Sequence, residues 1–133
     1  MSEYGIKLIW GGGKDDDVIG FSPSAYKRWH NQIQPGTRML LYETAKNKGV
    51  QGIVSEVEVI AGFAASAGLA TPTQEHNHPV RVKVIRGKRS IMAIPKQRVQ
   101  EVLGRPSFPQ QNDSWTPISE TTYRHLLSSW GKR

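Results

Sequence analysis

Residues 36–44 have the sequence Gly-Thr-Arg-Met-Leu-Leu-Tyr-Glu-Thr, and after a short polar break residues 49–59 continue as Gly-Val-Gln-Gly-Ile-Val-Ser-Glu-Val-Glu-Val. The unbroken apolar run from Met39 to Tyr42 predicts a strand covered on both faces. The second segment alternates, which predicts one face with Ile53, Ser55, Val57 and Val59 and an opposite face with Val54, Glu56 and Glu58. Residues 45–49 have the length of a hairpin loop, so we expect these two strands to be neighbours in a sheet.

The length of the chain, 133 residues, predicts one domain spanning residues 1–133. The absence of cysteine excludes disulfide scaffolds, thiolate zinc sites and cysteine nucleophiles. No apolar run approaches the roughly 20 residues of a membrane-spanning helix. The first residues lack the basic start and apolar core of a signal peptide. We therefore expect a soluble, cytoplasmic protein with no membrane partner.

The charge is strongly positive. Eighteen Lys and Arg residues outnumber eleven Asp and Glu residues, which gives a formal net charge of +7. Nucleic acid is the polyanion that such a surface most often meets. The alternative from charge alone is a basic protein without a polyanionic partner.

The remaining pattern predicts elements around the central pair. Extended segments are expected at residues 4–10, 79–86 and 114–118. Helices are expected at residues 22–32, at 95–104, and from Ser119 to about Trp130. Residues 60–78 have no firm period and predict a long loop with at most a short helical turn.

Two groups of residues in the sequence are of types that bind metal ions, but the spacing of neither group predicts a metal site. The three consecutive aspartates at 15–17 differ from the spaced ligands of hard-cation sites, which favours a solvated loop. His76 and His78 share one side of an extended segment, but we expect no further residue to complete a ligand set with them. The glycines at 11–13 lack the spacing of a phosphate loop. We expect no cofactor and no metal.

Basic residues gather on the strand at 79–86 and in the turn after it. Such a ribbon would contact a nucleic-acid backbone with salt-dependent affinity and no sequence preference. The alternative is an edge strand protected by charge against aggregation. The cations that we predict to contact a backbone are Lys27, Arg28, Arg81, Lys83, Arg86, Lys88, Arg89, Lys96 and Arg98.

The order of elements resembles the EVE domain, a member of the PUA-like group that also contains YTH and ASCH domains. The resemblance covers most of the chain except residues 60–78. It is carried by an ordered set of residues: Gly36, Leu40, Leu41, Tyr42, Gly49, Gly52, Ile53, Val57, Pro117, Ile118, Ser119 and Tyr123. It implies an α+β fold in which a small, curved β-barrel of five or six strands is flanked by helices.

The resemblance also implies a function, because EVE and YTH domains hold a modified base in an aromatic pocket beside the barrel. The residues that fall where the family has this pocket are Trp10, Phe21, Ser22, Tyr42, Glu43 and Thr44. Trp115, in a polar segment, is a further candidate for a pocket wall or lid. For the aromatic residues, the alternative is a place in the core. Glu43 departs from the family, and the Asn-Tyr-x-Ala-Arg-Asn run of EVE domains is replaced here by residues 21–28.

The sequence thus predicts a module that binds DNA or RNA and recognises a base flipped out of its stack. Methylated or hydroxymethylated cytosine and N6-methyladenine are the candidate bases. One alternative is an ASCH- or PUA-type RNA-binding module without preference for a modified base. Another is an ASCH-type hydrolase of modified nucleosides that uses Glu43, Thr44 and Lys46. The resemblance further implies a nuclease or restriction system as a possible partner.

Overall fold

The computed structural model describes residues 3–11, 17–71, 74–87 and 92–131. The strands in it are β1 (Tyr4–Ile9), β2 (Val18–Phe21), β3 (Arg38–Glu43), β4 (Gly52–Ala61), β5 (His78–Arg86), β6 (Ile94–Pro95) and β7 (Trp115–Pro117). The helices are α1 (Pro23–Trp29), α2 (Phe63–Ser66), α3 (Lys96–Leu103) and α4 (Glu120–Leu127), with a 3-10 turn at Lys46–Lys48. None of the described helices is long and apolar enough to cross a membrane.

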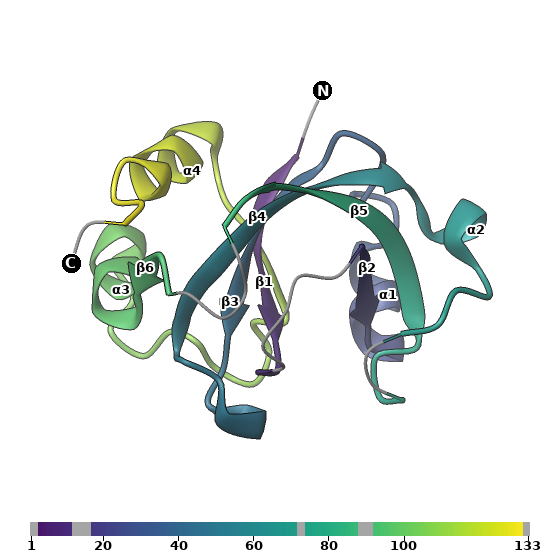
Figure 1. Cartoon of the computed structure of the whole chain (residues 1–133), viewed down its shortest axis with the longest axis horizontal. Helices are drawn as coiled ribbons and strands as arrows, with labels where there is room; N and C mark the ends of the chain where they lie inside the picture. The colour runs from purple at the N-terminus through teal and green to yellow at the C-terminus, as the bar shows by residue number, and fades with distance from the viewer. Residues whose placement is uncertain (1–2, 12–16, 72–73, 88–91, 132–133) are drawn as a thin grey trace.

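The strands form one strongly curved sheet in the order β2-β5-β4-β3-β1-β7, and β6 pairs with β4 outside this path. β4 and β5 arch over the molecule, α3 and α4 lie at one end of the arch, and α1 and α2 lie at the other (Figure 1). The predicted α+β class with a curved sheet and flanking helices is therefore confirmed. The described residues contain seven strands rather than five or six, because β2 and the two-residue β6 join the sheet.

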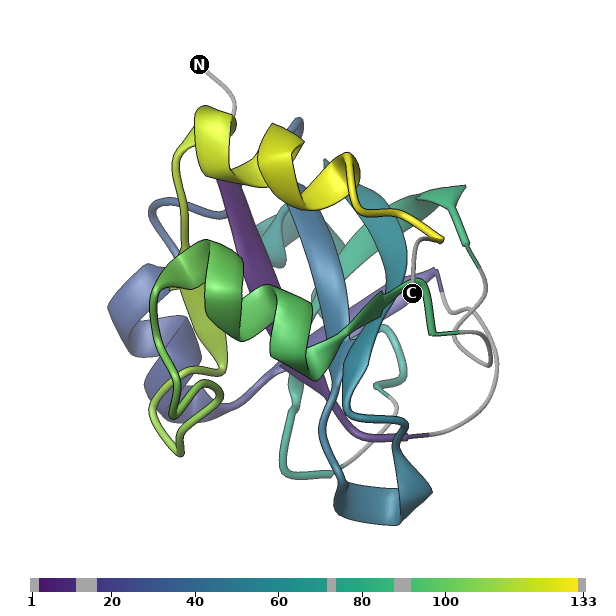
Figure 2. The ribbon, with the colours of Figure 1, turned by 90° about the vertical axis from the view of Figure 1, so that its left-hand side faces the viewer.

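Apolar side chains fill both sides of this sheet. An inner cluster inside the curve includes Met39 and Leu41, whereas an outer cluster includes Leu40 and Tyr42 and packs against α3 and α4. Figure 2 shows α3 and α4 lying across the outside of the sheet. The prediction that β3 is covered on both faces is confirmed, since all its residues from Met39 to Glu43 are buried.

The predicted alternation of β4 is wrong at the start of the strand, although Val57 and Val59 share one face as predicted. Ile53 belongs to the outer cluster, whereas Val57 and Val59 belong to the inner one. The reason is a register shift, because the partner of Leu41 is Ser55 and the partner of the next residue, Tyr42, is Ile53. A bulge of this kind moves the following side chains to the opposite face.

In residues 60–71 and 74–78 the structure has more regular elements than the predicted long loop, and the short helical turn expected there is α2. β4 continues to Ala61, α2 follows, and β5 already begins at His78. The buried hydroxyl of Ser66 donates to the carbonyl of Ala61 (3.0 Å) and accepts from the backbone N–H of Arg81 (3.1 Å). This small helix is therefore held between two neighbouring strands.

A buried carboxylate joins the sheet to α4. Glu56 is fully buried. Its carboxylate oxygens accept hydrogen bonds from the hydroxyl of Tyr123 at 2.6 Å and from Nε of Arg86 at 2.8 Å. Nη1 of Arg38 lies 3.7 Å from the same carboxylate. Ser119 caps α4 by accepting from the N–H of Thr122, which starts the helix one turn before Tyr123. The spacing of Ser119 and Tyr123 in the sequence thus places the tyrosine over Glu56.

We predict that Tyr123→Phe lowers the free energy of unfolding by about 1–3 kcal/mol, because it removes a hydrogen bond from a buried charge. Urea denaturation measures this loss. Tyr26→Phe is the control, since Tyr26 is only half-buried and its ring contacts survive the change. Equal stability of the Tyr123→Phe variant and the unaltered protein would contradict the role assigned to this bond.

Candidate functional site

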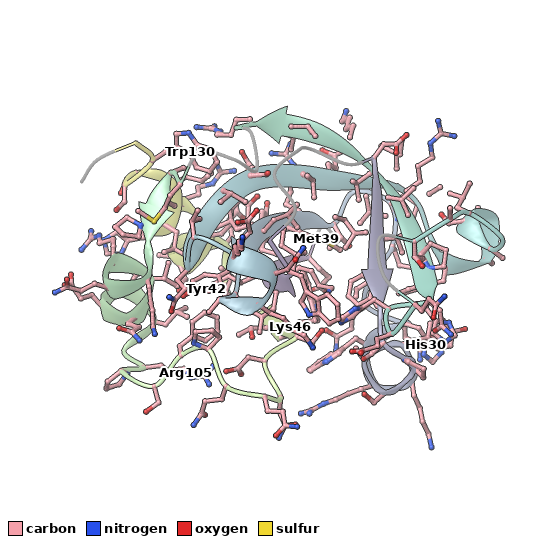
Figure 3. All side chains as sticks on the ribbon, turned by 60° about the horizontal axis from the view of Figure 1, so that its bottom comes forward. His30, Met39, Tyr42, Lys46, Arg105 and Trp130 are labelled. Carbon is pink, nitrogen blue, oxygen red and sulfur yellow. The ribbon has the colours of Figure 1, made fainter. Side chains whose placement is uncertain are left out.

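A cavity of about 490 Å³ opens at the end of the sheet that carries the β3–β4 hairpin. Its walls come from the ends of β1 and β3, the hairpin loop, the loop that leads to β7, and the first residue of α3. The residues that line this cavity include Leu8, Trp10, Tyr42, Thr44, Lys46, Gln51, His76, Lys96, Gln110, Gln111 and Ser114. Figure 3 shows Tyr42 and Lys46 at this end of the molecule. The volume lies within the range of about 300–1,000 Å³ that is typical of small-molecule sites.

The parallel pairing of β1 and β3 brings Trp10 next to the hairpin. Leu8 pairs with Tyr42, so both strands end at the same edge of the sheet. Just beyond Trp10, the N–H of Gly11 donates to the carbonyl of Lys46 (3.0 Å), and Nδ2 of Asn47 donates to the carbonyl of Gly11 (2.7 Å). A Cβ at Gly11 would lie only 2.6 Å from the backbone of Asn47, so this close approach requires glycine.

The indole of Trp10 is half-buried and has two neighbours in the cavity. Nζ of Lys46 lies 4.0 Å from the ring centroid, a cation–π distance. The imidazole of His76 meets the indole edge to face, with centroids 5.3 Å apart. Burial lowers the pKa of His76, the positive charges of Lys7 and Lys46 lower it further, and Glu75 opposes the change. The imidazole is therefore neutral at pH 7, and the cations near Trp10 are lysines.

Tyr42 lines the cavity and carries a buried polar atom without a partner. The residue is 1 % exposed, and its hydroxyl has no hydrogen-bond partner in the structure. Burial raises the pKa of Tyr42 to about 12, so the hydroxyl stays protonated and can both donate and accept a hydrogen bond. Phe108 fixes the ring by an edge-to-face contact at 5.7 Å. A buried hydroxyl of this kind is costly unless a ligand or a water completes its bonding.

Besides the apolar Leu8, Ala45 and Pro109, the other lining residues include polar and positively charged side chains. The hydroxyls of Thr44 and Ser114 and the amide side chains of Gln51, Gln110 and Gln111 line the cavity. Among its described lining residues, none is Asp or Glu. The arrangement supplies one aromatic face, several hydrogen-bonding groups and an excess of positive charge, without a carboxylate to act as a base.

Two aromatic residues predicted for the base pocket lie in the inner core instead. Phe21 is fully buried and packs edge to face on Phe63 at 5.3 Å. Trp115 is 2 % exposed and covers Gly5 so closely that a Cβ there would lie 2.4 Å from the indole. Both are corrections to the sequence prediction, and the reason is that each side chain points into the curve of the sheet.

Two polar residues predicted for the pocket are also elsewhere. Ser22 caps α1, with its hydroxyl accepting from the N–H of Ala25 at 3.2 Å. Glu43 is 3 % exposed, does not line the cavity, and accepts from the N–H of Val50 at 3.2 Å. The structure thus brings together only Trp10, Tyr42 and Thr44 of the predicted pocket. The residues suggested for hydrolysis are likewise separated, since Glu43 lies outside the cavity that Thr44 and Lys46 line.

Several of the basic residues that we predicted to contact a nucleic-acid backbone instead contact other residues of the protein. Arg86 binds Glu56, and Lys83 lies 3.9 Å from Glu58. Nε of Arg98 donates to the hydroxyl of Ser129 at 2.8 Å.

The remaining predicted cations differ in their surroundings. Lys27, Arg28 and Arg81 are exposed, and Arg28 lies over the ring of Trp29. Lys96 lies in the cavity wall rather than on an outer face. Lys88 and Arg89 fall outside the described residues.

The contacts that His76, His78 and Lys7 make in the structure were not predicted from the sequence. His76 was considered only as a metal ligand, yet it contacts Trp10. His78 does not join His76 at Trp10 but stacks on Tyr26, with ring centroids 4.2 Å apart. Lys7 is 1 % exposed, and its ammonium group donates to the carbonyl of Leu8 (2.7 Å) and the hydroxyl of Ser114 (3.3 Å), behind the cavity wall. An unusual lysine between apolar strand residues was the available signal.

Solved structures with the same fold include a hypothetical protein from Leishmania major, at a TM-score of 0.62 and 17 % identity over 96 % of this chain and 94 % of that one. The YTH domain of Mmi1 in complex with RNA has a TM-score of 0.64 and 12 % identity, over 96 % and 76 %. Human THYN1 in complex with DNA containing 5-methylcytosine has a TM-score of 0.58 and 11 % identity, over 95 % and 96 %. At these identities the likeness shows a PUA-like fold.

Sequence comparison adds no closer relationship. No protein-family model matches the chain. No curated protein matches it either.

We predict that Tyr42→Phe keeps or raises the free energy of unfolding, by up to about 1 kcal/mol, because it removes a buried hydroxyl without a partner. This is the opposite sign from Tyr123→Phe, although the chemical change is the same. Both variants are compared by urea denaturation under one set of conditions. A loss of more than about 1 kcal/mol for Tyr42→Phe would mean that its hydroxyl is bonded in solution.

Proposed function

We propose that this protein is an EVE-like member of the PUA-like group that binds a nucleic acid and holds one modified base in the cavity beside Trp10. The observation that carries the proposal is that one cavity is lined both by the half-buried indole of Trp10 and by Tyr42, whose hydroxyl is buried and unpartnered.

The physical demands of base recognition match this combination. A base that leaves its stack needs an aromatic face to replace the lost stacking, which contributes about 1–3 kcal/mol per base. Trp10 offers that face once the long side chain of Lys46 moves aside. The hydroxyl of Tyr42 can bond to a ring nitrogen or exocyclic group on the edge of the base. A methyl group on the base adds about 0.8 kcal/mol if Leu8 and neighbouring apolar atoms bury it.

The properties of the chain and its structural neighbours support a polyanionic ligand. The net charge is +7, and phosphate contacts position a strand while a pocket selects the base. The solved structures with this fold include complexes with RNA and a complex with DNA containing 5-methylcytosine. Lys27, Arg28 and Arg81 are the exposed cations that we assign to backbone contacts.

Fluorescence anisotropy tests the proposal with short DNA and RNA strands, single and double, at one salt concentration. The strands carry an unmodified base, 5-methylcytosine, 5-hydroxymethylcytosine or N6-methyladenine. We predict a preference of about tenfold or more for one modification, equal to about 1.4 kcal/mol. Trp10→Ala should abolish this preference, and Tyr42→Phe should weaken it without loss of stability.

Trp130→Ala is the matched control, because Trp130 is also half-buried but packs near Arg86, outside the cavity. It should retain the preference. Equal affinity for all strands, falling only with salt, would overturn base selection and favour a general RNA- or DNA-binding module.

A further inference from the structure

The cavity has an excess of positive charge that base stacking alone does not use. Lys46 and Lys96 both line it, and neither forms an ion pair with a carboxylate among the described residues. The buried ammonium group of Lys7 lies behind the same wall, at Ser114. Two carboxylates next to lining residues are bonded elsewhere, since Asp113 binds Arg105 at 2.8 Å and Glu43 accepts from Val50, whereas Glu75 acts on the imidazole of His76.

Lys96, which lines the cavity, is the first residue of α3, and the first turn of this helix carries backbone donors. α3 has eight residues and begins at Lys96, and its N-cap, Pro95, provides no side-chain hydrogen bond. No acidic residue occupies the first turn. The amide groups there carry partial positive charge and can accept an anion. Tyr42, which lines the same cavity, adds a buried hydroxyl that has no hydrogen-bond partner in the structure.

The register of the sheet sets the distance between Trp10 and this helix end. Pro95 pairs with Gly52, which pairs with Glu43 on β3, and β3 pairs with β1. Pro95 is therefore two strand spacings from β3 and three from β1, about 10 and 14 Å. These are separations between strand backbones. A base with its sugar and phosphate is long enough to stack on Trp10 and bring its phosphate to the side chain of Lys96.

Lys46 connects the two parts of the site. Its ammonium group now lies 4.0 Å from the centroid of Trp10, on the face that a base would cover. The side chain is exposed and flexible, so an incoming base displaces it at low cost. A phosphate on the same ligand then offers the displaced charge a partner.

We propose that the cavity takes a nucleotide together with its phosphate, which lies between Lys46, Lys96 and the first-turn amides of α3 while the base stacks on Trp10. This inference rests on the proposed function and assigns the phosphate part of the same site. It makes Lys96 a specific ligand contact rather than one of many surface charges.

The test places a neutral methylphosphonate linkage in single strands that contain 5-methylcytosine or N6-methyladenine. The linkage stands either next to the modified nucleotide or far from it. For the unaltered protein, we expect the adjacent linkage to weaken binding about tenfold more than the distant one, as loss of a charge-assisted bond would. Lys96→Ala should remove that difference, and Lys96→Arg should keep most of it.

Arg124→Gln is the control for net charge, because Arg124 is an exposed residue of α4 that pairs with Glu120. It should leave the difference unchanged. Equal effects of the two linkage positions, with a preference for the modified base retained, would overturn the phosphate site and leave the proposed function standing. A Lys96-dependent effect without any preference for the modified base would support the phosphate site and overturn base reading.

Discussion

The parallel pairing of β1 with β3 is the constraint on which the site depends. Parallel strands end at the same edge, so Leu8 opposite Tyr42 places Trp10 beside the hairpin that follows β3. The hairpin is then fixed by hydrogen bonds at Gly11, and Lys46 comes to lie on the indole. One register thus positions an aromatic face, a tyrosine hydroxyl and an ammonium group that are distant in sequence. A slip of one residue would turn Tyr42 into the inner core.

Glu56 and Tyr42 carry buried polar groups with different roles. Glu56 is surrounded by Tyr123, Arg38 and Arg86, and this network ties α4 to the sheet. Tyr42 has no such partner, although it is buried to a similar extent. A satisfied buried group stabilises a unique packing, whereas an unsatisfied one in a cavity costs stability that a ligand can restore. This contrast separates the structural tyrosine from the one at the site.

Much of the fold could be predicted from local sequence. The apolar run at Met39–Tyr42 and the cap at Ser119 act within a few residues, and both elements form as expected. The site was harder, because its contacts are long-range. The places of Trp10 and Tyr42 in the site could be predicted from the order of the strands and the family resemblance. The contact of His76 with Trp10 could not, because nothing in the local sequence indicates it. Phe21 and Trp115 were misplaced because the direction of a side chain on a short strand depends on register, which residue type does not reveal.

The most direct test of the account follows the four tryptophan indole N–H signals by two-dimensional NMR. The protein is titrated with the modified strand that binds it most tightly. Base stacking in the cavity predicts a large shift for Trp10, while the indole of Trp115, buried in the inner core, keeps its position. Shifts confined to Trp29 or Trp130, with Trp10 unchanged, would contradict the location of the site.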